Sequence, residues 1–491
     1  MTEEKKRGIT VKKTENFSEW FTQICSEQGA QLVDIRYGIQ GFIVHRPWAM
    51  KVLNRIYTLL EQAVEADGHE PHLFPTVILE DNLTKEAEHA GFIPDVFWVT
   101  QAGEHTLEKK WALRPTGETQ IYPMYSLWIR SYNDLPYKGY QSRHTTFRHE
   151  MTTRPFLRGR EFMFFETHDV FATHKEALTQ IKVDMQIMDE VIRDKLKVPF
   201  IFFRRPQWDK FKGADDTYAS DSLLPDGRRL QISSTHDLGH NFAEAFNITF
   251  HNKDGKEEFG WQTCFGPGIW RIMACLIGIH GDDTGLILPF DLGPQQIVII
   301  PILKGNDTDE EVKTYCEDLK TALKQYRVII DDSDNSPGYK YNHWEMKGVP
   351  LRIEIGSREA AQGTITLARR LGEKKTTVKQ EDLNNAIITL ANELDTDIGR
   401  RAEAYFKDRI KHAQTKEELI HVIKNHRGFV TVPFCTTNNE GAVCAEHIKA
   451  DTGGADVCGV PLAHAQEPKK DDVCVQCGKK ATVIVYCAKS V

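Results

Sequence analysis

The residues best suited to chemistry are concentrated between positions 141 and 171. Arg148, Arg154, Arg158 and Arg160 surround one expected hairpin, together with three glutamates. A guanidinium group can pair with phosphate through two parallel hydrogen bonds, so this density of arginine suits an anion with several oxygens. Charge alone would equally allow a solvated hairpin held by salt bridges. The order F-R-x-E, a loop, then R-x-R-E-F favours the anion site.

The elements that must position this hairpin follow no regular βαβ alternation. Apolar spacing predicts helices over 17–28, 49–67, 116–130, 175–196 and 268–278, and strands over 72–79, 97–100, 111–114, 230–233 and 259–264. Pro75 interrupts the first of these strands, which we expect to be buried. Strands next to hairpins and long connections are typical of an antiparallel sheet flanked by helices, so the predicted class is α+β.

The pattern changes at position 295. Strands over 296–303, 327–332, 351–356 and 364–369 alternate with helices over 310–326 and 341–347, which indicates a small α/β domain with a mostly parallel sheet. A long helix over 380–413 then leads into a cysteine-rich tail. The predicted division is a flexible arm over 1–16, a first domain over 17–290, a second over 291–395 and a small α+β domain over 396–491.

Composition sets broad limits on function. The chain has 491 residues, of which 40% are hydrophobic and 27% charged, as in ordinary soluble globular proteins. It contains no apolar run long enough for a membrane span and no secretory signal, so we expect a cytoplasmic protein without a membrane partner. The net charge of −8 argues against a protein that coats nucleic acid, but it allows a local basic surface that meets one folded RNA.

The cysteines are unevenly distributed. Six of the ten follow position 434, and they include the pair Cys474-x2-Cys477. Without a secretory signal, such a cluster indicates metal binding or reduced thiols before disulfides. A C-x2-C pair supplies two corners of a tetrahedral zinc site.

Three segments resemble, in chain order, the three motifs of class II aminoacyl-tRNA synthetases. They lie at 72–81, with Pro75, at 141–171, and at 268–289. From about position 15 onward the chain is similar to prolyl-tRNA synthetases of the archaeal and eukaryotic type. The resemblance implies the class II synthetase fold, a ligase that activates L-proline with ATP and Mg²⁺, and transfer of the prolyl group to tRNA(Pro). It also implies a homodimer, because the first motif lies at the dimer interface in that family.

The resemblance assigns roles to the arginine-rich hairpin. Arg148 would contact the α-phosphate and the amino-acid carboxylate, and Glu150 the adenine amino group. Arg158 would reach the outer phosphates, Phe162 would stack on adenine, and Arg271 would reach the γ-phosphate. Arg148 and Arg271 are the expected catalytic residues, because fixed positive charge stabilises the pentavalent phosphorus as it forms. The alternative interpretation is that the segment around Arg271 is an ordinary buried helix.

A second set of residues would select proline. The segment R-P-T-G-E at 114–118 is similar to a loop of this family, in which Thr116 and Glu118 would accept the two N–H groups of proline's secondary ammonium. A purely local role is the alternative: Thr116 caps a helix and Glu118 favours its N-terminal dipole. Phe92 and Phe164 would wall the pyrrolidine ring.

Two further strands complete this predicted site by resemblance. Gln231 and Ser234 would face the adenylate, and His236 the proline. Cys264 would be a small residue of the pocket wall. Alternatively, His236 is a structural histidine and Cys264 is an inert buried thiol.

The resemblance extends to the C-terminal half. Tyr341, Glu345 and Arg352 would read the anticodon bases by stacking and edge hydrogen bonds. A surface helix with charge pairs is the alternative.

The tail is similar to a family domain that binds zinc through four cysteines. The expected ligands are Cys435, Cys444, Cys474 and Cys477, although the first pair is more widely spaced than usual. A metal-free form is the alternative, and Cys458 and Cys487 could substitute as ligands.

The connection between Phe171 and Gly268 is too short for the editing domain that bacterial-type relatives carry. The enzyme must then reject alanine because alanine fills the pocket less well than proline, and this difference in binding free energy is only a few kcal/mol. A separate alanine-editing protein is therefore an expected partner. Two rival functions remain at this point. One is a ligase of the same fold for threonine or serine, disfavoured because only Cys264 and His236 are evident as zinc ligands near the pocket. The other is a non-catalytic tRNA-binding paralogue, disfavoured because Arg148 and Arg271 are present.

Overall fold

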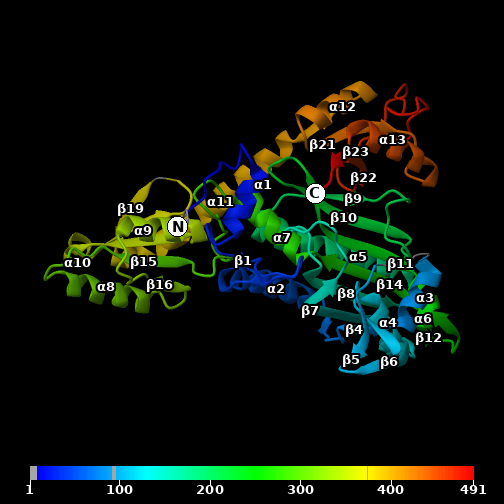
Figure 1. The fold of residues 1–491 in the computed structure, drawn as a ribbon, viewed down its shortest axis with the longest axis horizontal. Coiled ribbons are helices and arrows are strands. Elements are labelled where there is room, and N and C mark those ends of the chain that lie inside the picture. Colours follow the sequence, from blue (N-terminus) through cyan, green and yellow to red (C-terminus); the bar gives the residue numbers. More distant parts are fainter. Residues whose placement is uncertain (1–7, 91–94, 373) are drawn as a thin grey trace.

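The structure, a computed structural model, describes residues 8–90, 95–372 and 374–491. Its centre is an eleven-stranded sheet in the order β20-β21-β23-β22-β9-β10-β11-β14-β8-β7-β3 (Figure 1). The strands of the first domain are β3 (Glu70–Pro71), β7 (Tyr137–Phe147), β8 (Glu161–Phe171), β9 (Ile201–Arg204), β10 (Asp216–Leu223), β11 (Arg229–Gly239) and β14 (Trp261–Pro267). They pair antiparallel from β9 to β7, which confirms the predicted α+β class. The sequence prediction missed β9 and β10.

Helices bury their apolar faces against this sheet. They are α1 (Phe17–Cys25), α2 (Pro47–Ala66), α5 (His174–Met188), which continues as a π-helix over Asp189–Lys195, and α7 (Ile269–Cys275), which continues as a π-helix over Leu276–His280. Val52, Ile56 and Leu60 of α2 are fully buried, as their helical spacing predicts. Helix α5 begins with a capping box between Thr173 and Glu176.

The segment predicted as a buried strand over 72–79 is different in the structure. Only β3 joins the large sheet, where it pairs parallel with β7. After Pro75 the chain enters a separate three-stranded sheet made of β4 (Val77–Leu79), β6 (His105–Leu113) and β5 (Trp98–Ala102). Proline cannot donate to a strand ladder, which accounts for the break. Leu73 is 84% exposed, whereas Phe74 and Ile78 are buried, so only part of this apolar segment belongs to the core.

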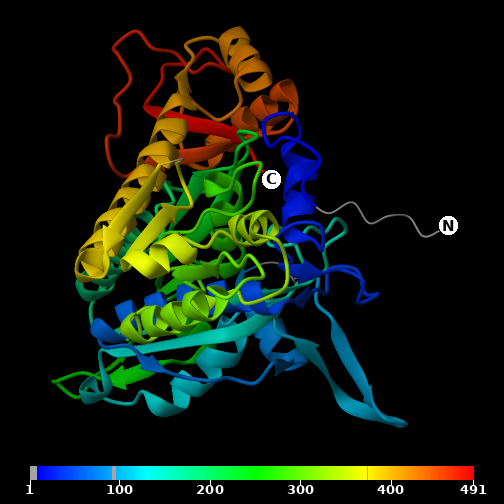
Figure 2. The ribbon, with the colours of Figure 1, turned by 90° about the vertical axis from the view of Figure 1, so that its left-hand side faces the viewer.

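The helix predicted from Thr116 begins later. Helix α4 spans Glu118–Trp128 and its N-cap is Gly117, so the prediction that Thr116 caps it is wrong. Helices α3 (Glu80–Ala90) and α6 (Asn241–Phe246) were not predicted. Four short strands, β1 (Val33–Asp34), β2 (Val44–His45), β12 (Thr249–His251) and β13 (Glu257–Phe259), form two small ribbons. A longer ribbon, β5–β6, protrudes from the first domain (Figure 2).

The middle domain carries its own five-stranded sheet in the order β16-β15-β17-β18-β19. Its elements are β15 (Ile297–Pro301), α8 (Asp309–Ala322), β16 (Val328–Ile330), α9 (Pro337–Lys347), β17 (Leu351–Ile355), α10 (Ser357–Gln362), β18 (Thr364–Arg369), β19 (Lys375–Lys379) and α11 (Leu383–Asp408). Strand β15 pairs parallel with two neighbours, whereas β18 pairs antiparallel on both sides. The sheet is therefore mixed, not mostly parallel, because β19 adds a hairpin that the sequence pattern did not predict.

The C-terminal domain extends the large sheet. Its elements are β20 (Ile410–His412), α12 (Lys416–Asn425), β21 (Phe429–Phe434), α13 (Ala442–Thr452), β22 (Ala455–Pro461) and β23 (Val483–Lys489). Strand β22 pairs with β9, so one sheet runs from this domain into the first. Residues 1–7 of the predicted arm lie outside the described residues, and Lys13 donates to the carbonyls of Ile279 and Gly281. Among the described residues, no helix is both long and apolar enough to cross a membrane.

Candidate active site

A cavity of about 310 Å³ opens where the β7–β8 hairpin, the loop before α4, β11, β14 and α7 meet. Its lining contains every residue predicted to contact ATP or proline that the structure describes: Thr116, Glu118, Arg148, Glu150, Arg158, Phe162, Phe164, Gln231, Ser234, His236, Cys264 and Arg271. Phe92 lies outside the described residues. Residues from distant parts of the chain thus share one cavity, although each binding role stays a prediction.

One end of the cavity is rich in positive charge. Arg148 follows β7 and its guanidinium carbon lies 6.0 Å from the centre of the Phe162 ring. Arg158 Nη1 lies 3.7 Å from Glu150 Oε2. Burial, with repulsion from Arg148 and Arg158, lowers the pKa of Arg271 to about 10. Three guanidinium groups that repel one another form a site that a polyanion stabilises.

Aromatic rings line the floor between the two ends. Phe162 and Phe164 point to the same face of β8, because side chains two apart on a strand share a face. Their ring centres are 6.2 Å apart and nearly perpendicular. His144 packs edge-on against Phe164 at 6.0 Å. Gly266 leaves space for this phenylalanine, since a Cβ there would stand 2.9 Å from its ring. These rings form flat apolar surfaces for a base and a small ring.

The other end of the cavity presents acceptors without donors. Thr116 Oγ1 and Glu118 Oε2 are buried and have no hydrogen-bond partner among the described residues. Buried polar atoms in folded proteins are nearly always paired. Two such atoms facing one cavity indicate a ligand with N–H groups. Glu118 also lies in the first turn of α4, so its local role with the helix dipole coexists with this one.

A row of polar side chains crosses three strands beside these acceptors. The register pairs Cys264 with His236 on one side and with His168 on the other. His236 Nδ1 lies 2.9 Å from Thr217 Oγ1. Burial, reinforced by His168, lowers the pKa of His236 to about 3, so its imidazole is neutral at neutral pH. Burial also raises the pKa of the Cys264 thiol well above its usual range, so the thiol is unreactive.

Sequence reasoning missed the buried charge cluster behind this row. Glu166 Oε1 lies 3.1 Å from His144 Nε2, and its Oε2 lies 3.1 Å from His168 Nε2. Burial opposes ionisation of Glu166, but hydrogen bonds from the two histidines hold its pKa well below the usual range. The alternation of β8 was the available signal, since positions 162, 164, 166 and 168 share one face.

The same cluster corrects one sequence-based argument. Glu118, His168 and Cys264 offer ligand atoms within 4.8 Å of one another, so metal-capable groups near the pocket are more numerous than Cys264 and His236. A shortage of metal ligands near the pocket is therefore no argument against a threonine ligase.

The residues predicted to read an anticodon are also brought together. Arg352 on β17 donates to Glu345 Oε1 of α9 over 3.0 Å and stacks 4.2 Å from the centre of the Tyr341 ring. Glu354, which was not predicted, accepts from Arg352 over 3.0 Å and from Lys375 over 2.7 Å. The arrangement presents an aromatic face next to alternating charges.

The tail places four thiols around one point. Cys435, Cys444, Cys474 and Cys477 have sulfur atoms within 4.8 Å of one another, and Cys435 and Cys444 are 3.8 Å apart. Cys435 directly follows β21, Cys444 lies on α13, and the turn at 474–477 supplies the other two thiols. This donor set fits tetrahedral zinc. Cys458 and Cys487 are not members of the cluster.

The antiparallel sheet, with an arginine-rich hairpin on one side of its cavity, defines a class II aminoacyl-tRNA synthetase. Residues 97–280 match the family model "tRNA synthetase class II core domain (G, H, P, S and T)", and residues 296–390 match "Anticodon binding domain". Residues 416–490 match "Prolyl-tRNA synthetase, C-terminal", and a proline–tRNA ligase of Thermofilum pendens is 50% identical over 490 residues, 99% of each chain. The chain belongs to the prolyl-tRNA synthetase family.

Other relatives agree with this placement. A proline–tRNA ligase of Pyrococcus horikoshii is 39% identical over 97% of this chain and 98% of its own. The Giardia lamblia prolyl-tRNA synthetase, solved with prolyl-adenylate, has 35% identity and a TM-score of 0.91 over 98% of this chain and 99% of its own. The Cryptosporidium parvum enzyme, solved with halofuginone and AMPPNP, has 31% identity and the same TM-score over 99% and 97%.

Proposed function

We propose that this ligase activates L-proline with ATP and transfers the prolyl group to the 3′-terminal adenosine of tRNA(Pro). One observation carries the proposal: a single cavity has three arginines at one end and two unpartnered acceptors, on Thr116 and Glu118, at the other. That polarity suits a reaction that joins an amino acid to a nucleotide. The rival amino acids are disfavoured by the relatives, whose names specify proline.

The first step brings two anions together. A carboxylate oxygen of proline attacks the α-phosphorus of ATP, the bond to the bridging oxygen breaks, and pyrophosphate leaves with its electron pair. Arg148, at the positive end of the cavity, offsets the charge of both groups. Arg158 and Arg271 receive the outer phosphates, assisted by Mg²⁺ bound with ATP. Positioning and fixed charge suffice, because no covalent protein intermediate is needed.

Proline itself is recognised by its secondary ammonium. Glu118 accepts one N–H with charge assistance and Thr116 accepts the other, which satisfies both buried oxygens. Phe164 packs on the ring, and the neutral His236 and the small Cys264 line the same cavity. Glu166 also lines it and, through its pairs with His144 and His168, holds these histidines in place. Glu150, Phe162, Gln231 and Ser234 hold the adenosine part.

The second step and the choice of tRNA involve the rest of the chain. The adenosine 3′-hydroxyl attacks the prolyl carbonyl and releases AMP. Tyr341 stacks on an unpaired anticodon base, and Glu345 and Arg352 contact base edges, with carboxylates able to accept the N1 and N2 protons of guanine. A separate protein would remove mischarged alanine, and the cytoplasm is the expected location.

Two structural features support further parts of the proposal. The four-cysteine cluster would hold a structural Zn²⁺, which would tie the turn at 474–477 to β21 and α13. A homodimer would cover the exposed apolar residues Leu73, Val77 and Leu79, which are 84%, 38% and 44% exposed in the chain alone. Large exposed apolar groups close together are typical of an interface.

The deciding experiment is ATP–pyrophosphate exchange with each amino acid in turn, followed by aminoacylation of tRNA(Pro). We expect exchange with proline. Exchange with threonine or serine but not proline would establish the first rival. A folded protein that shows no exchange with any amino acid would establish the non-catalytic paralogue.

A further inference from the structure

A buried ion network reaches the nucleotide end of the cavity, which Arg205 itself helps to line. Arg205, next to the end of β9, is 4% exposed, and Asp221 of β10 is fully buried. The guanidinium of Arg205 pairs bidentately with this carboxylate, through Nη1 over 2.8 Å and Nη2 over 2.7 Å. Arg229 of β11 donates to the same carboxylate over 2.9 Å. Two buried guanidinium groups therefore share one carboxylate, a costly arrangement unless its geometry serves a purpose.

Arg205 makes two further bonds that point in different directions. Its Nη2 donates to the side-chain oxygen of Gln231 over 3.0 Å, and its Nη1 donates to the main-chain carbonyl of Cys458 over 2.7 Å. A guanidinium has only donors, so the Gln231 amide must turn its oxygen toward Arg205. This orientation leaves the amide NH₂ for other partners, and Gln231 lines the cavity. Arg205 thus determines which end of the amide a nucleotide can meet.

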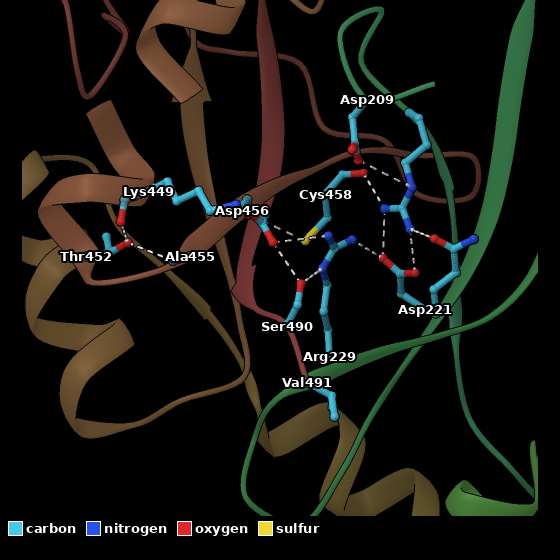
Figure 3. Close-up of polar contacts among 12 residues, drawn as sticks. Asp209, Asp221, Arg229, Lys449, Thr452, Ala455, Asp456, Cys458, Ser490 and Val491 are labelled. Atoms are coloured by element: carbon cyan, nitrogen blue, oxygen red, sulfur yellow. Dashed lines mark hydrogen bonds and ion pairs between the residues drawn. The ribbon is translucent and has the colours of Figure 1, made fainter. Parts of the chain in front are cut away.

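The network continues into the C-terminal domain (Figure 3). Arg229 donates to Ser490 Oγ over 2.9 Å and lies 3.4 Å from Asp456. Asp456 also accepts from Ser490 over 2.8 Å and pairs with Lys449 over 2.9 Å. Strand β22, which carries Asp456, pairs with β9 through the main chain. A rigid, fully hydrogen-bonded path therefore links this domain to Gln231.

We propose that Arg205 is a positioning residue for adenylate formation, held by Asp221 and the Cys458 carbonyl, and that through it the C-terminal domain orients the amide of Gln231. The proposal rests on the role given above to Gln231 in the nucleotide site. A network that only fastened two domains would not need the bond from Arg205 to Gln231. Lysine cannot replace Arg205, because a single ammonium cannot reproduce the two parallel bonds and the two additional ones.

Arg205→Lys tests the proposal through the kinetics of proline-dependent exchange. Loss of an oriented hydrogen bond to a charged group predicts a rise of about tenfold in KM for ATP, with KM for proline changed less than about twofold. Arg204→Lys is the matched control, because Arg204 is the adjacent residue and its side chain is 55% exposed in a pair with Asp216. We expect the control to leave both constants unchanged. Equal rises in both KM values for Arg205→Lys would overturn the proposal.

A double-mutant cycle separates positioning from a structural role. If Arg205 acts through Gln231, Arg205→Lys should change KM for ATP by less than about twofold in a Gln231→Ala background. Additive effects would overturn the proposal. Should Arg205→Lys fail to fold, Asp456→Asn addresses the same path from the C-terminal domain. We expect Asp456→Asn to raise KM for ATP about threefold, because it weakens the ion pair with Arg229. An unchanged KM would show that the C-terminal domain does not act on the nucleotide site along this path.

Failure of the proposed function would look different. Wild-type protein would then show no exchange with proline, whatever the variants did. Binding of AMPPNP, measured by calorimetry on wild type and Arg205→Lys, would still test the orientation of Gln231. Weaker binding by the variant supports the positioning role, and equal binding contradicts it.

Discussion

Gly117 lies directly against the carboxylate of Glu166, so close that a Cβ at position 117 would overlap both carboxylate oxygens. The loop that carries Thr116 and Glu118 thereby rests on the buried Glu166 and its two histidines. The backbone of Gly117 is in the right-handed helical region, so glycine is needed here for space and not for conformation.

Gly117→Ala should therefore damage recognition of the amino acid before it damages the fold. The added methyl must push Glu166 or the loop aside, at a cost of about 1–3 kcal/mol. We expect KM for proline to rise about tenfold, with KM for ATP nearly unchanged. Gly338→Ala is the spatial control, since a Cβ there also meets nothing within 4 Å and Gly338 does not have a positive φ. A normal KM for proline in Gly117→Ala would show that this contact does not position the loop.

Glu118→Gln tests the unpartnered carboxylate directly. The amide keeps the size of the side chain but loses the charge that attracts a secondary ammonium, and a hydrogen bond to a charged group is worth about 1.5–3 kcal/mol. KM for proline should rise roughly ten- to a hundredfold in pyrophosphate exchange. Glu108→Gln, on the exposed face of β6, is the control. An unchanged KM would remove Glu118 from the proline site.

Arg148→Ala should stop adenylate formation while the protein stays folded. Removal of one preorganised donor from a developing charge typically costs about a hundredfold or more in rate. The Arg148 side chain is exposed, so circular dichroism and the melting temperature should match those of wild type. Arg36→Ala removes an exposed arginine paired with Asp34 and should retain full exchange. Near-normal exchange by Arg148→Ala would contradict its role.

Stability should fall with rising pH because of one buried carboxyl. Burial, with repulsion from Asp169, raises the pKa of Asp184 from 3.8 to about 8. Between these values the folded state binds a proton that the unfolded state has released, so this stabilisation is complete below pH 3.8 and is lost as the pH rises to about 8. Asp184→Asn cannot lose a proton there. Urea unfolding from pH 5 to 8 should show the variant gaining stability relative to wild type.

Asp189→Asn is the control for that series, since Asp189 on the same helical segment is 48% exposed. Its stability should follow the wild-type curve. Parallel curves for wild type and Asp184→Asn would show that Asp184 is already ionised in the folded protein.

The thiol cluster predicts about one zinc ion per chain, because four cysteines make one tetrahedral site. Replacing Cys474 and Cys477 by serine should remove the metal and lower the melting temperature, as measured by elemental analysis and thermal unfolding. Cys458→Ala should keep the zinc, since Cys458 is outside the cluster. Zinc loss in Cys458→Ala, or retention in the double variant, would show that the ligands are different.

Local pattern was enough to predict much of this molecule. Helix α2 and the β7–β8 hairpin follow from short-range spacing, because helix and strand periodicities are properties of neighbouring residues. The motif residues follow from the resemblance to a known family. Those of the second and third motifs share one cavity, whereas residues 72–81 of the first do not line it. The errors arose where tertiary contacts override local preference. Thr116 looks like a helix cap but leaves that position to Gly117, and the apolar run at 72–79 is only partly buried.

The amino-acid sequence by itself determined which chemical groups the protein offers: arginines for phosphates, acceptors for an ammonium group and thiols for a metal ion. Only the tertiary structure decided which of these groups meet. Glu166 meets two histidines at the pocket because β7 and β8 pair, and Arg205 reaches Gln231 because β9, β10 and β11 lie side by side. The C-terminal domain joins the same sheet through β22 and β9. These contacts join residues on different strands, and the β22–β9 pairing joins parts of the chain more than two hundred positions apart, so no local spacing records them.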